Sequence, residues 1–386
     1  MIPRLVEKMV YTLLDQPRKI VLIVGARQVG KTTLLKHLQA NLEQKRKRVI
    51  YLNCDIAEDL SRVNTFSLTL LQQLTSNVDF LLLDEAQRLG DPGRTLKILH
   101  DHIPAVRVIA TGSSSLDLKN TLSDPLTGRL RDLMLSPLSL GELMGDIGGP
   151  QQAPYLADGL MTYGGYPEIA LTNDPVQKQV QLTKIIDAYL FKDILAFQKV
   201  RQPQILIDLV RALAYQIGAE VNENELASRL KIDRKTVVNY IDLLVKTFVL
   251  VRVFPFSKNP RREIGKNFKV YFVDLGIRNA LIGDFHAVHL RADVGALWEN
   301  FLVIERLKMF TNTGKPVQYH FWRTYGGAEV DYLERETTRT TIRAFEFKWG
   351  SGRLSRGARS FTHTYNIPVT LVNRENFLTF TNHALT

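Results

Sequence analysis

The feature that most constrains the fold is the glycine-rich run GARQVGKT at 25–32, which fits G-x-x-x-x-G-K-[ST] at every fixed position. It follows the apolar segment KIVLIV and opens the amphipathic segment TTLLKHLQANL. This strand–loop–helix context is the one that the motif requires, because the backbone N–H groups then wrap an anion at a helix N-terminus. The sequence therefore predicts an α/β fold with a phosphate-binding loop.

The loop predicts which residues hold ATP and Mg²⁺. Lys31 is expected to reach the β- and γ-phosphates, and the Thr32 hydroxyl is expected to ligate Mg²⁺. A chance match in a glycine loop is the alternative, but the flanking strand and helix argue against it. The predicted nucleotide-binding residues are Gly25, Ala26, Arg27, Gln28, Val29, Gly30, Lys31, Thr32 and Thr33.

Two acids follow four apolar residues in the segment FLLLDE, which predicts a buried strand with carboxylates at its end. Asp84 is expected to hold Mg²⁺ through water, and Glu85 to orient and deprotonate the attacking water. The second acid indicates a hydrolase rather than a kinase. A helix cap is the alternative interpretation of the pair.

Two further positions are predicted to act on the γ-phosphate. Ser113 or Ser114, at the end of the strand in ATGSSS, is expected to sense it, and a Ser/Gly turn with a helix cap is the alternative. Arg129, favoured over Arg131, precedes the expected strand 133–139 and is predicted to reach the nucleotide of a neighbouring subunit. A surface salt bridge is an equally good interpretation of Arg129.

Composition sets limits on the class of protein. The 386 residues allow two or three domains, and 45% apolar with 23% charged residues is ordinary for a globular chain. A single cysteine excludes an intramolecular disulfide and multi-cysteine zinc sites. The absence of a leader or a long apolar run predicts a cytoplasmic protein without membrane contact. The net charge of 50 − 39 = +11 suggests a polyanionic partner.

A short helix, a turn and a second helix are predicted over 224–244, with Asp233 capping the second helix. Its polar face near the N-terminal end resembles that of a DNA-recognition helix, and a basic β-hairpin wing is expected to follow. Contacts with protein only are the alternative. The predicted DNA-binding residues are Arg234, Lys235, Lys258, Arg261, Arg262 and Lys266.

The C-terminal segment resembles the PD-(D/E)XK nuclease arrangement, with an acid on a helix, an acid on a strand and E-x-K on the next strand. By this resemblance Asp331 and Glu346 share a divalent metal, with Glu299 as a further candidate ligand, and Lys348 orients or deprotonates water. No proline precedes Asp331, where Glu329-Val330 stands instead. The alternative is a fold retained only for binding.

The segments GARQVGKTTLL, FLLLDEAQ, ATGSSS, GR…LSPLSLGEL and YGGYPE, in this order, resemble prokaryotic AAA-superfamily ATPases with a C-terminal domain of unknown function. The later segments KVYFVDLGIRNAL, LWENFLVIE and EVDYLE…FEFKWG fit as well. The resemblance implies an α/β chain of four parts. They are a P-loop ATPase core with an AAA-like parallel sheet (1–150), a helical lid (151–215), a winged helix (216–285) and a PD-(D/E)XK nuclease-like α/β domain (286–386).

Two functions follow as hypotheses. The first is an ATP- and Mg²⁺-dependent, DNA-directed ATPase, a motor or remodeller of branched or other DNA, which assembles into a ring or another oligomer. The second is a nucleotide-gated switch with a catalytically inactive C-terminal domain that binds a partner. Stimulation of ATP hydrolysis by DNA separates the two.

Overall fold

The computed structural model describes residues 2–16, 18–112, 126–147, 149–188, 202–257, 267–324, 326–336 and 341–381. The chain divides into two compact units, Arg4–Ser136 and Pro137–Thr386, the latter joined by Met1–Pro3. The sequence placed its first boundary after residue 150, whereas this division falls at Pro137. Each unit is described by itself.

The N-terminal unit alternates helices and strands, as the apolar runs predicted. Its elements are α1 (Val6–Asp15), β1 (Ile20–Val24), α2 (Lys31–Gln44), β2 (Val49–Asn53), α3 (Ala57–Val63), α4 (Leu68–Leu74), β3 (Phe80–Asp84), η1 (Ala86–Arg88), α5 (Pro92–His102), β4 (Arg107–Gly112) and β5 (Leu130–Met134).

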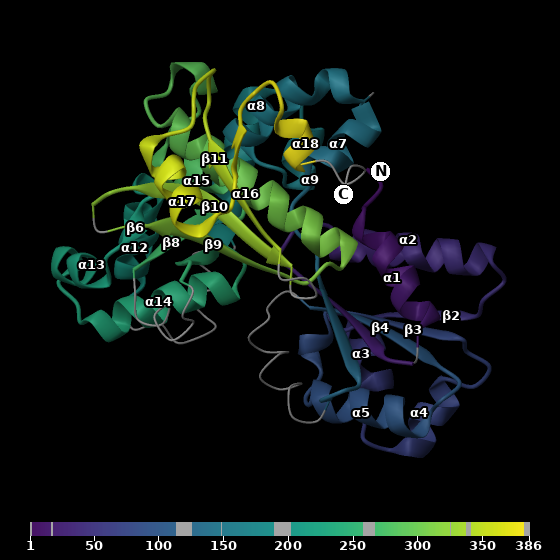
Figure 1. The fold of residues 1–386 in the computed structure, drawn as a ribbon. Coiled ribbons are helices and arrows are strands. Elements are labelled where there is room, and N and C mark those ends of the chain that lie inside the picture. The colour runs from purple at the N-terminus through teal and green to yellow at the C-terminus, as the bar shows by residue number, and fades with distance from the viewer. Residues whose placement is uncertain are drawn as a thin grey trace. The chain divides into compact units, whose positions relative to one another are not determined.

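Its strands form a parallel sheet of five in the described part of this unit, in the order β2-β3-β4-β1-β5. Strands β1 and β3 are buried along their whole length, because helices cover both faces. In Figure 1, α1 and α2 lie on one face of this sheet and α3, α4 and α5 on the other. Since the strands are parallel, the carboxyl ends of β1, β3 and β4 lie together at the same end of the sheet.

The last strand lies earlier than the sequence indicated. The apolar run at 133–139 predicted a strand there, but β5 spans Leu130–Met134 and pairs with β1 from Ile20↔Leu130 to Val24↔Met134. Because β5 is at the edge of the sheet, it tolerates exposed polar residues such as Arg131 and Asp132. The hydrophobic run therefore misplaced this strand by several residues.

The second unit begins with helices and continues into a mixed α/β region. Its elements are α7 (Leu140–Ile147), η2 (Pro150–Gln152), α8 (Ala153–Tyr163), α9 (Pro167–Leu171), α10 (Pro175–Ile185), α12 (Pro203–Tyr215), β6 (Glu220–Val221), α13 (Glu223–Leu230), α14 (Arg234–Lys246), β7 (Leu250–Pro255), β8 (Phe268–Phe272), α15 (Leu275–Ile282), η5 (Val288–Leu290), α16 (Val294–Thr313), β9 (Val317–Arg323), β10 (Glu329–Glu336), β11 (Ile342–Phe347), α17 (Arg356–Tyr365), β12 (Val369–Val372) and α18 (Phe377–Thr381).

One sheet contains strands from both of the predicted segments 216–285 and 286–386. Among the described residues it has seven strands in the order β12-β11-β10-β9-β7-β8-β6. The join is the parallel pair of β7 and β9, where Phe254 and Pro255 lie opposite His320 and Phe321. The segments 216–285 and 286–386 are therefore continuous through their backbone hydrogen bonds.

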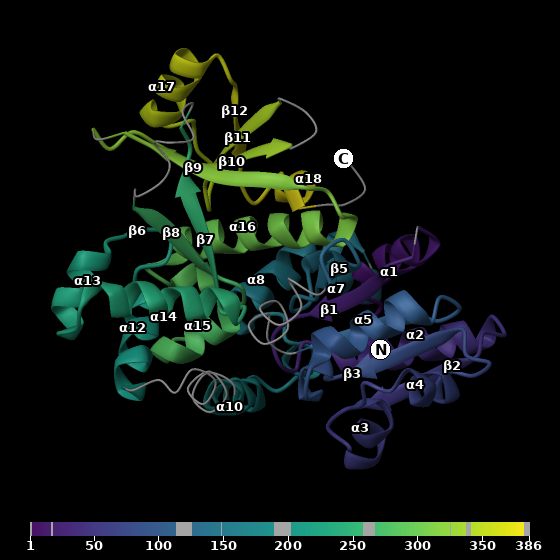
Figure 2. The ribbon, with the colours of Figure 1, turned by 90° about the horizontal axis from the view of Figure 1, so that it is seen from below.

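The C-terminal strands are covered on two faces. Ala344, Val330 and Trp322 pack against Phe361 of α17, whereas Phe345, which alternates with Ala344, packs on Phe380 of α18. Figure 2 shows α16 on one side of β9 to β11 and α17 on the other. The order helix, three strands, helix, strand is the one that the sequence predicted for 290–386.

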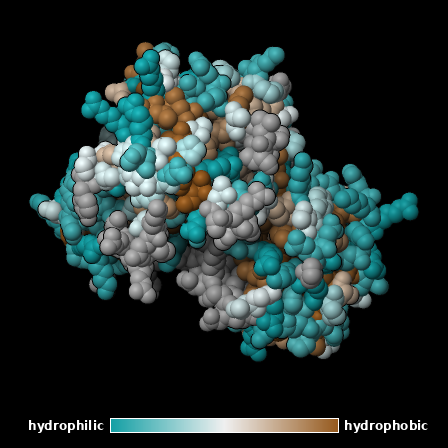
Figure 3. Space-filling model, in the orientation of Figure 1, coloured by the Kyte–Doolittle hydropathy of each residue, from teal (hydrophilic) through white to brown (hydrophobic). Residues whose placement is uncertain are grey.

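The surface is mixed in character. On the face drawn in Figure 3, hydrophilic residues predominate among the described ones, and hydrophobic residues lie between them in small groups. Across the described ranges of the chain, every helix is too short or too polar to cross a bilayer.

Candidate functional site

The loop between β1 and α2 has the backbone that phosphate binding needs. Gly30 adopts φ +96° directly before α2, a conformation that L side chains rarely adopt. A Cβ on Gly25 would overlap the carbonyl oxygen of Leu135, so only glycine fits there. Arg4, which the sequence did not single out, braces the loop by donating to Val29 O at 2.7 Å. These contacts fix the loop at the N-terminus of α2.

The predicted nucleotide-binding residues differ in how far they are exposed. Gly25, Ala26, Val29 and Lys31 are buried, Gly30 and Thr32 are half-buried, and Arg27, Gln28 and Thr33 are exposed.

Lys31 is the ionisable group of the loop. Lys31 is 4% exposed, and its ammonium donates to Gly25 O at 3.1 Å and to Ala26 O at 2.9 Å. Burial lowers the pKa of Lys31 to about 8, although the charges of Glu85 and Asp84 oppose this shift. Asp84, the last residue of β3, and Glu85, which follows it, are thus the acids whose charges favour the ammonium form of Lys31.

Asp84 is held by hydroxyl groups from both neighbouring strands. Its side chain is 1% exposed, Tyr51 of β2 donates to Oδ2 at 2.9 Å, and Thr111 of β4 donates to Oδ1. Neither donor was predicted, because each lies on a strand that is distant from Asp84 in the sequence and meets it only through the pairing of β3 with β2 and β4.

Glu85 leaves the strand in an unusual conformation. Its backbone is left-handed, with φ 53° and ψ 45°, and its N–H donates to Thr111 Oγ1 at 3.1 Å. Gln87 donates from its side chain to the Glu85 carboxylate. Thr111 thus contacts both acids, one through its hydroxyl hydrogen and the other through its oxygen.

The arginine and serine predictions have different outcomes. Arg129 lies directly before β5 and donates from Nε to Asp101 Oδ1 of α5 at 2.7 Å. This hydrogen bond, followed by that of His100, lowers the pKa of Asp101 to about 2. Ser113 and Ser114 lie outside the described residues.

The second helix that the sequence predicted within 224–244 is present as α14. Asp233 caps it by accepting the N–H of Thr236 at 2.8 Å, as expected. Lys235 is exposed, and Arg234 is exposed but ion-paired with Glu223 at 2.6 Å. Four of the six predicted DNA contacts, Lys258, Arg261, Arg262 and Lys266, lie outside the described residues.

The C-terminal acids come together in part. Glu346 is 3% exposed and accepts Lys348 Nζ at 2.9 Å, and Asp331 on the adjacent strand accepts the N–H of Phe347 at 2.7 Å. Burial raises the pKa of Asp331 to about 7, and the charge of Glu299 adds to this shift. Glu299 is also bonded to Lys269 at 2.8 Å. This lysine was not among the predicted site residues.

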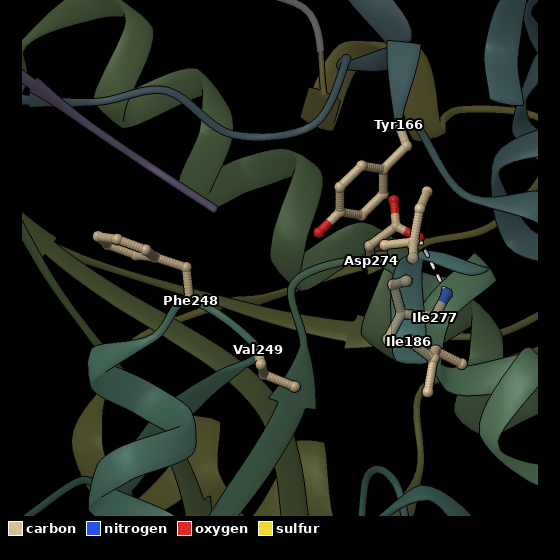
Figure 4. A pocket seen from close by; sticks show the side chains of 7 residues that line it. Tyr166, Ile186, Phe248, Val249, Asp274 and Ile277 are labelled. Carbon is tan, nitrogen blue, oxygen red and sulfur yellow. Dashed lines mark hydrogen bonds between the residues drawn. The ribbon is translucent and has the colours of Figure 1, made fainter. Parts of the chain in front are cut away.

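A separate hollow, drawn in Figure 4, is lined by Tyr166, Ile277 and Asp274. The Asp274 carboxylate accepts the N–H groups of Gly165 at 2.7 Å and Ile277 at 3.1 Å, and it caps α15. A side chain on Gly164 would overlap this carboxylate. The glycine at position 164 of the YGGYP turn is therefore needed, because only glycine can pack against the carboxylate of Asp274. The residues around this hollow hold the turn against the N-terminus of α15.

Three family models match successive parts of the chain. Residues 17–144 match a model described as an AAA domain. Residues 156–287 match a domain of unknown function (DUF8612), and residues 294–384 match another (DUF4143). The first match contains the loop, Lys31 and both acids, so residues 17–144 are similar to AAA domains.

Similar proteins add little about activity. An uncharacterized protein of Mycobacterium tuberculosis is 29% identical over 320 residues, which cover 82% of this chain and 67% of the relative. One from Haemophilus influenzae is 25% identical over 305 residues, covering 75% and 74%. The AMPPCP-bound DnaA of Aquifex aeolicus is 19% identical with a TM-score of 0.32, covering 62% of this chain and 85% of that one. At such a score the likeness carries no argument.

Proposed function

We propose that the chain hydrolyses ATP at the loop before α2. The observation that carries this proposal is that the loop after β1, with its buried Lys31, and the acids Asp84 and Glu85 at the end of β3 lie at the same end of one parallel sheet. An ammonium on a phosphate-binding loop opposite two adjacent carboxylates is the charge arrangement that phosphoryl transfer requires.

Each side chain has a distinct role in this proposal. The loop amides and Lys31 bind the triphosphate, and Glu85 orients the attacking water and takes its proton. The Thr32 hydroxyl would ligate Mg²⁺ directly, and Asp84, whose two oxygens already accept the hydroxyls of Tyr51 and Thr111, would hold the ion through water. Mg²⁺, when bound, neutralises charge on the β- and γ-phosphates.

A role of DNA is the second part of the proposal. The order α12, β6, α13, α14, β7, β8, with β6 and β7 both antiparallel to β8, supports the proposal of a winged helix. In this fold the N-terminal end of the second helix of the pair contacts DNA, where α14 presents Lys235 to solvent. The chain's charge of +11 supports binding to a polyanion.

Assembly and the arginine finger belong to the same proposal. In a ring or another oligomer, Arg129 would act on the nucleotide of the next subunit, and its release from Asp101 would be part of that step. Arg129→Ala should then lower the turnover rate while leaving ATP binding unchanged, and Arg131→Ala is the matched control.

The test is the rate of ATP hydrolysis by the full chain with and without duplex, branched and single-stranded DNA. Glu85→Gln should abolish turnover and retain ATP binding, whereas Glu43→Gln, an exposed glutamate of α2, should change neither. Absence of Mg²⁺-dependent binding of ATP, with or without DNA, would overturn the proposal.

The competing candidate is the nucleotide-gated switch. It is favoured by the pairing of Arg129 and Arg234 with acids of their own chain, which reduces the free charge available for a partner. Slow hydrolysis that DNA does not stimulate would support the switch, and strong stimulation would support the DNA-directed ATPase. We do not include nuclease chemistry in either candidate, because Glu299 is engaged by Lys269.

A further inference from the structure

A buried lysine lies among the acids that the nuclease resemblance assigns to a metal. Lys269 is 1% exposed, and its Nζ lies 2.8 Å from Glu299 Oε1 and 2.5 Å from Glu329 Oε1. Tyr271, two residues further along β8 and so on the same face, donates its hydroxyl to the same Glu299 oxygen at 2.7 Å. Glu299 Oε1 thus accepts both an ammonium and a phenol, so this oxygen has no lone pair left for a metal ion, and only Oε2 could act as a ligand.

The charges of this cluster are balanced by the protein itself. The Lys269 ammonium is buried and lies within hydrogen-bond distance of one carboxylate oxygen of Glu299 and one of Glu329. Carboxylates taken out of water need a paired charge, and this single ammonium supplies it to both acids.

The remaining acids of the nuclease pattern are also engaged. Glu346 accepts Lys348 on one oxygen and the N–H of Ser355 on the other, both at 2.9 Å. Within the described ranges, no three side chains of His, Cys, Asp or Glu are grouped so that they could hold a metal ion. Metal-assisted cleavage of a phosphodiester needs carboxylates that converge on one ion. The residues present do not fit the divalent metal that this arrangement implies.

We propose that Lys269 is a built-in cation in place of the nuclease metal, so that the C-terminal segment does not cleave phosphodiesters. Lys269 comes from β8, whereas Glu299 and Glu329 come from α16 and β10. One ammonium therefore neutralises two acids and joins the winged-helix-like segment to the C-terminal segment. A divalent ion at Glu299 would have to displace it, because like charges repel strongly in a buried site. This inference does not depend on ATP hydrolysis.

The test uses the full chain, stripped of metal, with Asp84→Asn in every arm to remove the metal ligand of the ATP site. Thermal unfolding is measured with and without millimolar Mn²⁺ for this background and for Glu299→Gln and Glu346→Gln added to it. We expect the Mn²⁺-induced shift in the unfolding midpoint to be the same in all three. Lys269→Met, where circular dichroism shows it to be folded, should gain a Mn²⁺-induced stabilisation that Glu299→Gln removes.

Cleavage is measured in parallel on linear, nicked, branched and single-stranded DNA. We expect Mn²⁺-dependent cleavage to be the same in the Asp84→Asn background and in its Glu346→Gln variant, because contaminating nuclease would act in both. A Mn²⁺ stabilisation of the background that Glu299→Gln or Glu346→Gln abolishes would overturn the proposal. So would cleavage that Glu346→Gln abolishes. If Lys269→Met does not fold, the comparison of the Asp84→Asn background with its Glu299→Gln and Glu346→Gln variants decides the question alone.

Discussion

Nucleotide binding should be accompanied by uptake of a proton by Lys31. Burial lowers the pKa of this ammonium to about 8, so at a pH equal to that pKa about half of the free protein carries neutral lysine. The phosphates of ATP stabilise the ammonium and raise its pKa again. Binding should then take up about half a proton per nucleotide at this pH and only about 0.03 at a pH 1.5 units lower.

Isothermal titration calorimetry measures this uptake. A non-hydrolysable ATP analogue with Mg²⁺ is titrated in two buffers of different ionisation enthalpy, and the difference in observed heat gives the number of protons. Phosphate itself contributes little at this pH, because its second ionisation has a pKa of about 6. Affinity should also fall about 10-fold per unit once the pH exceeds the pKa, because less ammonium is present.

Two variants make the result specific to Lys31. Lys31→Arg keeps a cation that cannot lose its proton, so the uptake should vanish in whatever binding remains. Lys36→Met, an exposed lysine of the same helix, should retain both the affinity and the uptake. Equal heats in the two buffers at the higher pH, for protein that binds the analogue normally, would refute this account of the loop.

Three further perturbations have defined outcomes. Tyr51→Phe removes a hydroxyl that donates to Asp84, so the Mg²⁺ concentration that half-saturates ATP hydrolysis should rise by an amount corresponding to about 1.5–3 kcal/mol, whereas Tyr11→Phe should leave it unchanged. Asp331 has a folded-state pKa of about 7 against an unfolded value of about 3.9, so it costs increasing stability as the pH rises through that window. Asp331→Asn should raise the unfolding midpoint at pH values above 7 and have little effect near 4, and equal effects at both would contradict this. The side chain of Glu334 is 0% exposed and is ion-paired with the buried guanidinium of Arg306 at 2.7 Å. Glu334→Ala should therefore lower the free energy of unfolding by about 3–5 kcal/mol, as measured by urea denaturation.

The strands and caps were predictable because local chemistry decides them. The run FLLLD could be buried only as an interior strand, and β3 spans those residues, Phe80–Asp84. Asp233 was identified as a cap from its position before an amphipathic run, and it accepts the N–H of Thr236. The loop at Gly25 was equally clear, since its glycines and lysine are adjacent in sequence.

The contacts that define the chemistry of the acids were not predictable, because their partners are distant in the chain. In the sequence, Lys269 is one of several basic residues in and around a predicted strand. Only the fold places it beside Glu299 and Glu329. Tyr51 likewise sits in an ordinary apolar strand until the pairing of β2 with β3 brings it to Asp84. A single sequence contains no signal for such long-range pairs.

The parallel pairing of β7 with β9 has a practical consequence for anyone who shortens this protein. A truncation near residue 286, where the sequence indicates a domain boundary, would separate two strands that share hydrogen bonds. Each fragment would then present an open strand edge, which is a template for aggregation. Gene fragments that keep 137–386 intact should express better than fragments divided at that point.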